Sequence, residues 1–185
     1  MRVAAVVLAA GSSRRLGELK QLVRLGKESL LERAIWVCRE AGCDPVVVVL
    51  GASANLILGR CSLEGTWVVV NEDWAEGMGS SVRSGVTALG ADVDGCVVTT
   101  CDMPAISAAH LLELMRTEQV TASAYAGRRG VPAFFPRGMF ESLMELSGDT
   151  GARELLQEAR VVNLPGGELD VDTVEDLARV RKFFE

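Results

Sequence analysis

The stretch that decides the fold is Val3-Ala-Ala-Val-Val-Leu-Ala-Ala-Gly11-Ser-Ser-Arg-Arg-Leu-Gly-Glu-Leu-Lys20, in which an apolar run is followed by a loop of glycine, serine and arginine. Small and β-branched residues in an unbroken run are typical of a strand buried on both faces of a parallel sheet. A strand followed by a glycine loop explains this short apolar run as well as a signal peptide does, and we favour the strand. The sequence therefore predicts a buried strand that ends at a glycine loop.

The same alternation continues along the chain. Apolar runs predict strands at Val3 to Ala9, Pro45 to Leu50, Trp67 to Val70 and Gly95 to Thr100, and helical spacing predicts helices at Glu28 to Glu40 and Ser80 to Leu89. This rhythm implies an α/β fold with a mostly parallel central sheet covered on both faces. The second half is less regular, with strands expected at Ala122 to Ala126 and Val131 to Phe135, and helices at Ala108 to Met115, Arg137 to Leu146, Thr150 to Glu158 and Thr173 to Phe184.

Length and composition limit the class of protein. The 185 residues, 49% of them hydrophobic and 24% charged, are expected to form one domain over 1–185. Five cysteines without a Cys-x-x-Cys pair argue against a disulfide framework and a structural zinc site, so a reducing cytoplasm fits best. The net charge of −6 argues against a nucleic-acid partner, and neither a bilayer-length apolar stretch nor a basic amphipathic helix indicates a membrane partner.

Positive charge gathers in the first loop. Five of the 19 basic residues lie between positions 11 and 27, where Glu18 is the only acid before Glu28. Glycine lets a phosphate approach the backbone, whose N–H groups and neighbouring hydroxyls donate to it, while arginine and lysine add charge. The loop is therefore a candidate polyphosphate cradle, although an ordinary glycine turn with solvated arginines would have the same spacing. It is neither a P-loop nor a dinucleotide fingerprint.

A carboxylate follows the fourth predicted strand in Cys101-Asp102-Met-Pro104. Open parallel sheets bind ligands at the carboxyl ends of their strands, so the loops after Ala9 and Thr100 should line one crevice. Magnesium prefers oxygen ligands and often binds through one or two carboxylates plus substrate phosphates, which makes Asp102 the first candidate metal ligand. Asp102 as a helix N-cap is the alternative, but Ser107 is better placed for that role.

Six segments together resemble one enzyme family. Leu8-Ala-Ala-Gly-x-Ser-x-Arg15-x-Gly17-x-x-Lys20 resembles the signature of the nucleotidyltransferases that form molybdopterin dinucleotides, and most closely the molybdenum cofactor cytidylyltransferases. Five later segments agree in order, so that the resemblance spans nearly the whole chain: Asn71-x-x-Trp74-x-x-Gly77-Met-Gly-Ser-Ser-Val-Arg-Ser-Gly85, Cys101-Asp-Met-Pro104, Gly130-Val-Pro132, Gly148-Asp-Thr-Gly-Ala-Arg153 and Asp170-Val-Asp-Thr-Val-Glu-Asp-Leu177.

The resemblance implies a three-layer, Rossmann-like domain of the nucleotide-diphospho-sugar transferase type. It implies transfer of CMP from CTP to the terminal phosphate of molybdopterin cofactor, with magnesium as cofactor and release of pyrophosphate, and a molybdenum hydroxylase becomes a candidate partner. The implied catalytic residues are Arg15, Lys20 and Asp102. The implied nucleotide-binding residues are Leu8, Ala9, Ala10, Gly11, Ser12, Ser13, Arg15, Lys20, Asn71, Gly79, Ser80 and Ser81.

The remaining motifs keep structural alternatives. The resemblance places Gly130, Pro132, Asp149 and Arg153 near the acceptor, although Gly130-Val-Pro132 could merely begin a strand and Asp149 could cap a helix. Likewise, Ser80 and Ser81 could belong to a plain serine-capped helix, and Trp74 could be a core residue. Asp172 is the second candidate metal ligand, or else the N-cap of the final helix. We expect His110 and Cys101 to be packing residues.

Three other functions remain open at this point. The first is a guanylyltransferase, because the physics of the loop does not choose between CTP and GTP. The second is a nucleotidyltransferase for a sugar 1-phosphate or another small phosphate, since the same cradle serves many acceptors. The third is a non-enzymatic accessory protein that delivers the cofactor.

Overall fold

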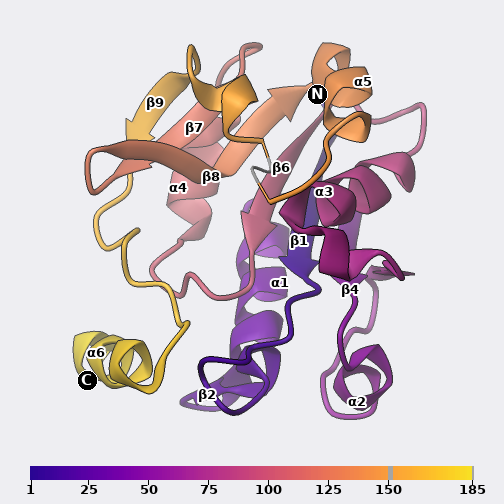
Figure 1. Cartoon of the computed structure of the whole chain (residues 1–185). Coiled ribbons are helices and arrows are strands. Elements are labelled where there is room, and N and C mark those ends of the chain that lie inside the picture. Colours follow the sequence, from indigo (N-terminus) through magenta and orange to yellow (C-terminus); the bar gives the residue numbers. More distant parts are fainter. Residues whose placement is uncertain (150–151, 185) are drawn as a thin grey trace.

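The computed structural model describes residues 1–149 and 152–184 and contains a seven-stranded sheet in the order β5-β4-β1-β6-β8-β7-β9 (Figure 1). Within the described residues, β8 is antiparallel to its neighbours, and all other pairings in the sheet are parallel. The expected mostly parallel sheet is therefore confirmed. The strands are β1 (Val3–Ala9), β4 (Val46–Leu50), β5 (Trp67–Val70), β6 (Gly95–Thr100), β7 (Thr121–Tyr125), β8 (Arg128–Pro136) and β9 (Arg160–Asn163).

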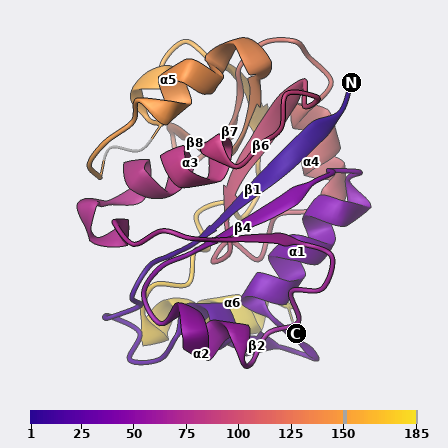
Figure 2. The same cartoon turned by 90° about the vertical axis from the view of Figure 1, so that its right-hand side faces the viewer.

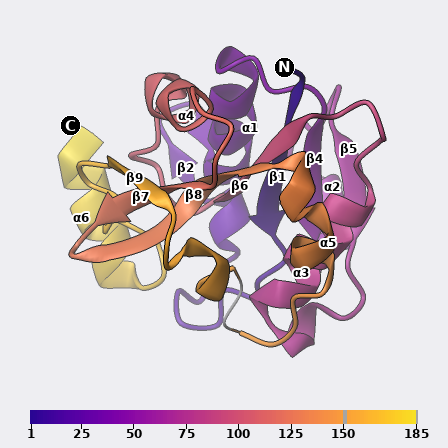
Figure 3. The same cartoon turned by 90° about the horizontal axis from the view of Figure 1, so that it is seen from above.

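Helices cover both faces of the sheet, as Figure 3 shows from above. One face carries α1 (Leu30–Glu40) and α4 (Ala108–Leu114), and the other carries α3 (Met78–Thr87) and α5 (Phe140–Met144). At the lower end in Figures 1 and 2, where β1 ends, lie α2 (Ala54–Leu58), α6 (Val174–Phe184) and a small hairpin of β2 (Arg24–Leu25) and β3 (Glu28–Ser29). Short 3-10 helices occur at Lys20–Leu22, Trp74–Glu76, Arg137–Met139 and Glu154–Leu156.

The central strand β1 is buried throughout and divides the core in two. Ala5, Val7 and Ala9 pack with α1 and α4, whereas Ala4, Val6 and Leu8 pack with α3 and α5. This alternation follows from the two-residue period of a strand. The short side chains of β1 also let α3 approach closely, because a Cβ on its Gly85 would lie 2.3 Å from Cγ1 of Val6.

A third apolar cluster joins the segment that follows β1 to the C-terminal segment. Leu16, Val23 and Leu30 pack against Val171, Leu177 and Val180, which anchors α6 on the segment that follows β1. The N-cap of α6 is formed by Thr173, whose Oγ1 accepts from the Asp176 backbone N–H at 3.2 Å. The reading of Asp172 as the cap of this helix was therefore wrong, and its carboxylate points elsewhere.

The boundaries differ from the sequence prediction in several places. The first helix begins at Leu30 rather than Glu28, since the Ser29 side chain accepts from Glu32 N–H and ends the preceding strand. Of the helix expected at Thr150 to Glu158, residues 150 and 151 lie outside the described residues. Only a 3-10 turn at Glu154–Leu156 forms in the described part. The prediction also missed α2, β9 and the small hairpin.

Two residues expected to pack rather than react are indeed buried. His110 accepts or donates a 2.7 Å hydrogen bond with Ser123 Oγ, and burial lowers its pKa. Cys101 is fully enclosed, and burial, followed by the charge of Asp102, raises its pKa to about 12. All five cysteines are buried free thiols. None of the helices in the described residues has the length and apolar composition that crossing a lipid bilayer requires.

The close approach of α3 to β1 gives a stability prediction. We expect Gly85→Ala to lower the free energy of unfolding by about 1–3 kcal/mol, because the new methyl group overlaps Val6 and Val49. The free energy can be measured by urea denaturation followed by circular dichroism. Gly138→Ala is the matched control, since a Cβ there meets no atom within 4 Å. Equal stability of the two variants would contradict the close packing.

Candidate active site

The site lies where β1 and β6 end. The two strands are parallel neighbours, with Leu8 opposite Thr100, so the loops that follow them leave the sheet at the same edge. Between these loops and the start of α3 lies a cavity of about 400 Å³, which we call the first cavity. It is lined by Leu8, Ala9, Ala10, Gly11, Ser12, Arg14, Lys20, Trp74, Ala75, Gly77, Met78, Ser81, Thr100, Asp102 and Asp149. The expected common crevice is therefore present.

A buried glutamine holds the glycine loop in shape. The side chain of Gln21 is fully buried, and its Nε2 donates to the carbonyl oxygens of Ala9 at 2.8 Å and Gly11 at 2.9 Å. Ser13 adopts a left-handed backbone, and its Oγ accepts from the Lys20 N–H at 3.0 Å. Ser13 therefore folds the loop instead of lining the cavity. This role of Gln21 was not predicted, although an amide next to the apolar residues Leu22 and Val23 was a signal.

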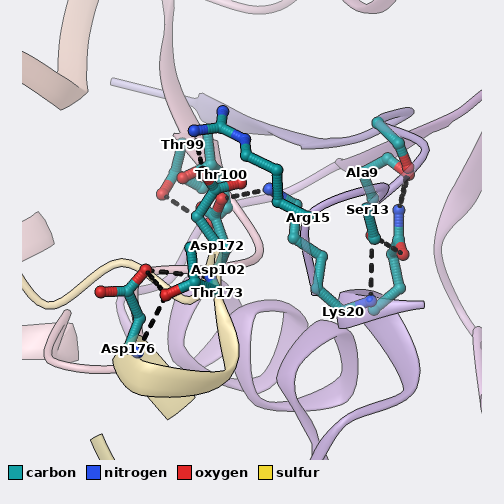
Figure 4. Close-up of polar contacts among 12 residues, drawn as sticks. Ala9, Ser13, Arg15, Lys20, Thr99, Thr100, Asp102, Asp172, Thr173 and Asp176 are labelled. Carbon is teal, nitrogen blue, oxygen red and sulfur yellow. Dashed lines mark hydrogen bonds and ion pairs between the residues drawn. The ribbon is translucent and has the colours of Figure 1, made fainter. Parts of the chain in front are cut away.

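Lys20 and Asp102 meet across the first cavity. Lys20 Nζ lies 2.7 Å from Asp102 Oδ2, and the two side chains are only 18% and 14% exposed (Figure 4). Burial alone lowers the pKa of Lys20, but the charge of Asp102 and the hydrogen bond to it act in the opposite direction, and the pKa ends above its ordinary value. Lys20 therefore carries a fixed positive charge in the crevice at neutral pH.

Arg15 and Asp172 form a second ion pair at the rim, also seen in Figure 4, with Arg15 Nη1 2.8 Å from Asp172 Oδ2. The Arg15 side chain is 76% exposed, so this pair contributes little to stability. In the described lining of the first cavity, Arg14 is present and Arg15 is not. Arg15 therefore stands beside the cavity, on the side of the C-terminal segment.

Buried polar residues hold the start of α3 in place beside the first cavity. Asn71 Nδ2 donates to Ser80 Oγ at 2.9 Å and to Ser81 Oγ at 3.1 Å, and all three residues are buried. The Gly79 N–H donates to the Gly148 carbonyl at 2.9 Å. Of the four predicted nucleotide contacts in this region, Ser81 lines the cavity. The other three do not belong to its described lining and instead position α3.

A second cavity of about 670 Å³ adjoins the first and shares Met78 and Asp149 with it. It is lined by Met78, Tyr125, Arg128, Arg129, Gly130, Val131, Asp149, Ala152, Arg153, Leu156 and Gln157. Three of the four predicted acceptor residues are thus in this lining. Pro132 is not, because it is buried in the sheet, where its carbonyl accepts from Ser123 Oγ at 2.6 Å. The cavity also contains three residues that were not predicted, namely Tyr125, Arg128 and Arg129.

Acidic side chains at the rim suit a magnesium ion that also binds substrate phosphates. The described residues contain no cluster of three or more His, Cys, Asp or Glu that would hold a metal alone. The Val171 N–H donates to the Asp102 carbonyl at 2.9 Å, so Asp172 follows directly after a residue that is hydrogen-bonded to Asp102. Two carboxylates, completed by phosphate oxygens, are a donor set that magnesium accepts.

Comparison with known proteins agrees with this geometry. The model of the MobA-like NTP transferase domain matches residues 5–163. Nicotine blue oxidoreductase of Paenarthrobacter nicotinovorans is 36% identical, with 96% of each chain covered. Purine catabolism protein PucB of Bacillus subtilis (strain 168) is 32% identical over 96% of this chain and 95% of its own. The molybdenum cofactor cytidylyltransferase of Escherichia coli (strain K12) is 22% identical over 96% and 94%.

Solved structures share the whole fold. A homologue of Mycobacterium tuberculosis Rv0371c from Mycobacterium sp. strain JC1 superposes with a TM-score of 0.86 at 34% identity, covering 100% of this chain and 98% of that chain. Rv0371c from Mycobacterium tuberculosis H37Rv in complex with manganese gives 0.83 at 29% identity, covering 98% and 99%. The chain therefore belongs to the MobA-like NTP transferase domain family and is a nucleotidyltransferase.

Proposed function

We propose that the protein transfers CMP from CTP to the terminal phosphate of molybdopterin cofactor and releases pyrophosphate, with magnesium as the metal. The observation that carries this proposal is the charged Lys20 held 2.7 Å from Asp102 in the first cavity. A cation and a carboxylate at one point of the crevice suit a reaction between two anions. The cation binds phosphate, and the carboxylate can help hold a divalent ion.

The residues of the loop perform the transfer by positioning. The attacking phosphate oxygen is already ionised at neutral pH, so no side chain has to remove a proton from it. Lys20, assisted by Arg15 at the rim, would bind the β and γ phosphates and the departing pyrophosphate, while Gly11 and Ser12 present backbone N–H groups and a hydroxyl. Magnesium held by Asp102 and Asp172 would supply Lewis-acid polarisation of phosphate oxygens.

The choice of CTP and of the acceptor has separate support. One relative that spans nearly the whole chain is a molybdenum cofactor cytidylyltransferase. A probable molybdenum cofactor guanylyltransferase of Opitutus terrae matches a shorter part, at 37% identity over 62% of this chain and 54% of its own. Longer coverage favours CTP, and the second cavity offers room for an acceptor beside the nucleotide. A molybdenum hydroxylase would then receive the product.

Donor and acceptor can be tested in one assay. Pyrophosphate release is measured for CTP, GTP, ATP and UTP, each with magnesium and with molybdopterin cofactor, glucose 1-phosphate or no acceptor. We expect pyrophosphate with CTP and molybdopterin cofactor. If pyrophosphate forms with GTP and not with CTP, the protein transfers GMP instead of CMP. If it forms with glucose 1-phosphate, the acceptor is a sugar phosphate instead of molybdopterin cofactor. Binding of CTP without pyrophosphate in any reaction would indicate an accessory protein.

Removal of the buried cation should weaken triphosphate binding. For Lys20→Ala we expect kcat/KM for CTP to fall at least tenfold, because a charge-assisted contact is worth roughly 1.5–3 kcal/mol. Steady-state pyrophosphate release measures the change. Lys27→Ala, an exposed lysine outside the cavity lining, is the control for lost charge. Wild-type kinetics of Lys20→Ala would remove Lys20 from the reaction.

Asp102 should govern the dependence on a divalent ion. For Asp102→Asn, we expect activity to be lost, because a neutral amide replaces one of the two carboxylates. We also expect that CTP no longer increases the affinity of the protein for Mn²⁺. Electron paramagnetic resonance of free Mn²⁺ measures binding, and thermal unfolding verifies the fold. Asp44→Asn changes an exposed carboxylate that pairs with Arg2 and serves as the control. Retained activity and unchanged Mn²⁺ binding would refute the assignment.

Gln21 should act on nucleotide binding without touching the nucleotide. Gln21→Leu removes both hydrogen bonds to the carbonyl oxygens of Ala9 and Gly11 and leaves those acceptors unpaired. We expect KM for CTP to rise at least fivefold, since each lost bond costs about 1 kcal/mol. The KM for molybdopterin cofactor should stay within twofold. An equal rise in both KM values would indicate general damage to the fold instead.

A further inference from the structure

The second cavity is lined by exposed arginines that form no ion pair within the described residues. Three arginines, Arg128, Arg129 and Arg153, belong to its lining, and Asp149 is the single acid among them. In residues 1–149 and 152–184, no carboxylate lies within ion-pair distance of any of these three guanidinium groups, and they donate no hydrogen bond to protein. Arginines gathered around a hollow without acidic partners are suited to an anionic ligand.

A tight hairpin sets the positions of two of these arginines. Between β7 and β8, Ala126 and Gly127 have φ values of 47° and 72°, and Tyr125 pairs directly with Arg128 across the turn. Two central residues with positive φ characterise the two-residue turn whose twist matches that of the strands. The hairpin extends from the sheet on the side away from β4 and β5 (Figure 3). Its arginines are therefore presented from a regular, short turn.

One of the three arginines, Arg128, forms a cation–π contact with Tyr125. The Arg128 guanidinium lies 5.1 Å from the centre of the Tyr125 ring, and the Tyr125 hydroxyl donates to the Val131 carbonyl at 3.1 Å. Gly130 makes room for this ring, since a Cβ there would lie 2.5 Å from the hydroxyl oxygen. Arg129 pairs with Ala124, so it lies on the opposite face of the hairpin from Tyr125, which is the face that also carries Ala122 and Ala152. Arg129 and Arg153 remain available to the cavity.

The arginines of the second cavity lie apart from the first cavity, where the phosphates would react. The first cavity contains Lys20 and Asp102, and among the described residues the linings of the two cavities share Met78 and Asp149. An acceptor that spans both cavities places its attacking phosphate in the first. Any group of that acceptor that reaches Arg129 and Arg153 is then a different group.

We propose that Arg129 and Arg153 determine the acceptor by binding a second anionic group, remote from the phosphate that attacks the nucleotide. This inference rests on the proposed function, in which the second cavity holds the acceptor. The substrate class is thus a phosphate monoester that carries another negative charge at its far end. The planar guanidinium groups can each donate two parallel hydrogen bonds to the oxygen or sulfur atoms of such a group.

Kinetics separate this role from nucleotide binding. In Arg129→Ala/Arg153→Ala, the KM for molybdopterin cofactor should rise on the order of tenfold or more, while the KM for CTP stays within twofold. Arg60→Ala/Arg181→Ala removes the same charge at two exposed arginines outside both linings and should change neither value. Arg129→Lys/Arg153→Lys should recover only part of the loss. An acceptor KM equal to that of wild type overturns the proposal.

A binding measurement keeps the inference testable if CMP transfer itself is not found. With the first cavity saturated by a non-hydrolysable CTP analogue, inorganic phosphate is titrated while the arginine Nε signals are followed by NMR. Saturable shifts of Arg129 and Arg153, absent in the alanine variant, support an anion site even when wild type releases no pyrophosphate with molybdopterin cofactor. In that case the proposed function fails and the anion site stands. Shifts confined to Arg14 and Arg15 in the first loop, or no shifts, overturn the inference.

Discussion

The parallel pairing of β1 with β6 is the constraint on which the site depends. Lys20 and Asp102 are 82 residues apart in the sequence, and they meet only because Leu8 lies opposite Thr100 in neighbouring strands that run the same way. The small side chains of β1 serve the same end. They allow helices to pack on both faces, which buries the strand and leaves the loop at its carboxyl end as the exposed part. The position of the charged residues thus depends on an apolar strand, of which Leu8 and Ala9 reach the cavity.

A loop rich in glycine and arginine does not hold its shape without support, and here it has two sources. From inside, Gln21 binds the carbonyl oxygens at the start of the loop. From outside, the C-terminal segment covers it, with Val171 and Leu177 packed against Leu16. The same segment brings Asp172 to the rim. Covering the loop and supplying a carboxylate are therefore two consequences of one packing arrangement.

Local patterns were sufficient to predict the strands that are buried, their order of alternation with helices, and the cavity at the ends of β1 and β6. They failed for β9, whose residues are mostly exposed and give no apolar period. The residues that line the cavity were harder to predict. Asn71 and Ser80 are residue types that often bind ligands, but here their side chains are hydrogen-bonded to each other. The roles of Tyr125 and Arg129 depend on a two-residue turn at Ala126 and Gly127, whereas the sequence prediction extended the strand through Ala126.

The ion pair between Lys20 and Asp102 also explains how one crevice can receive both a triphosphate and a divalent cation. An unpaired Asp102, only 14% exposed, would cost free energy through burial of its charge and would repel phosphate. Pairing with Lys20 offsets both effects before any ligand arrives. In the proposed reaction, Lys20 would bind phosphate and Asp102 would help hold the metal. Each group would then face an opposite charge in place of the other, so neither would be left uncompensated.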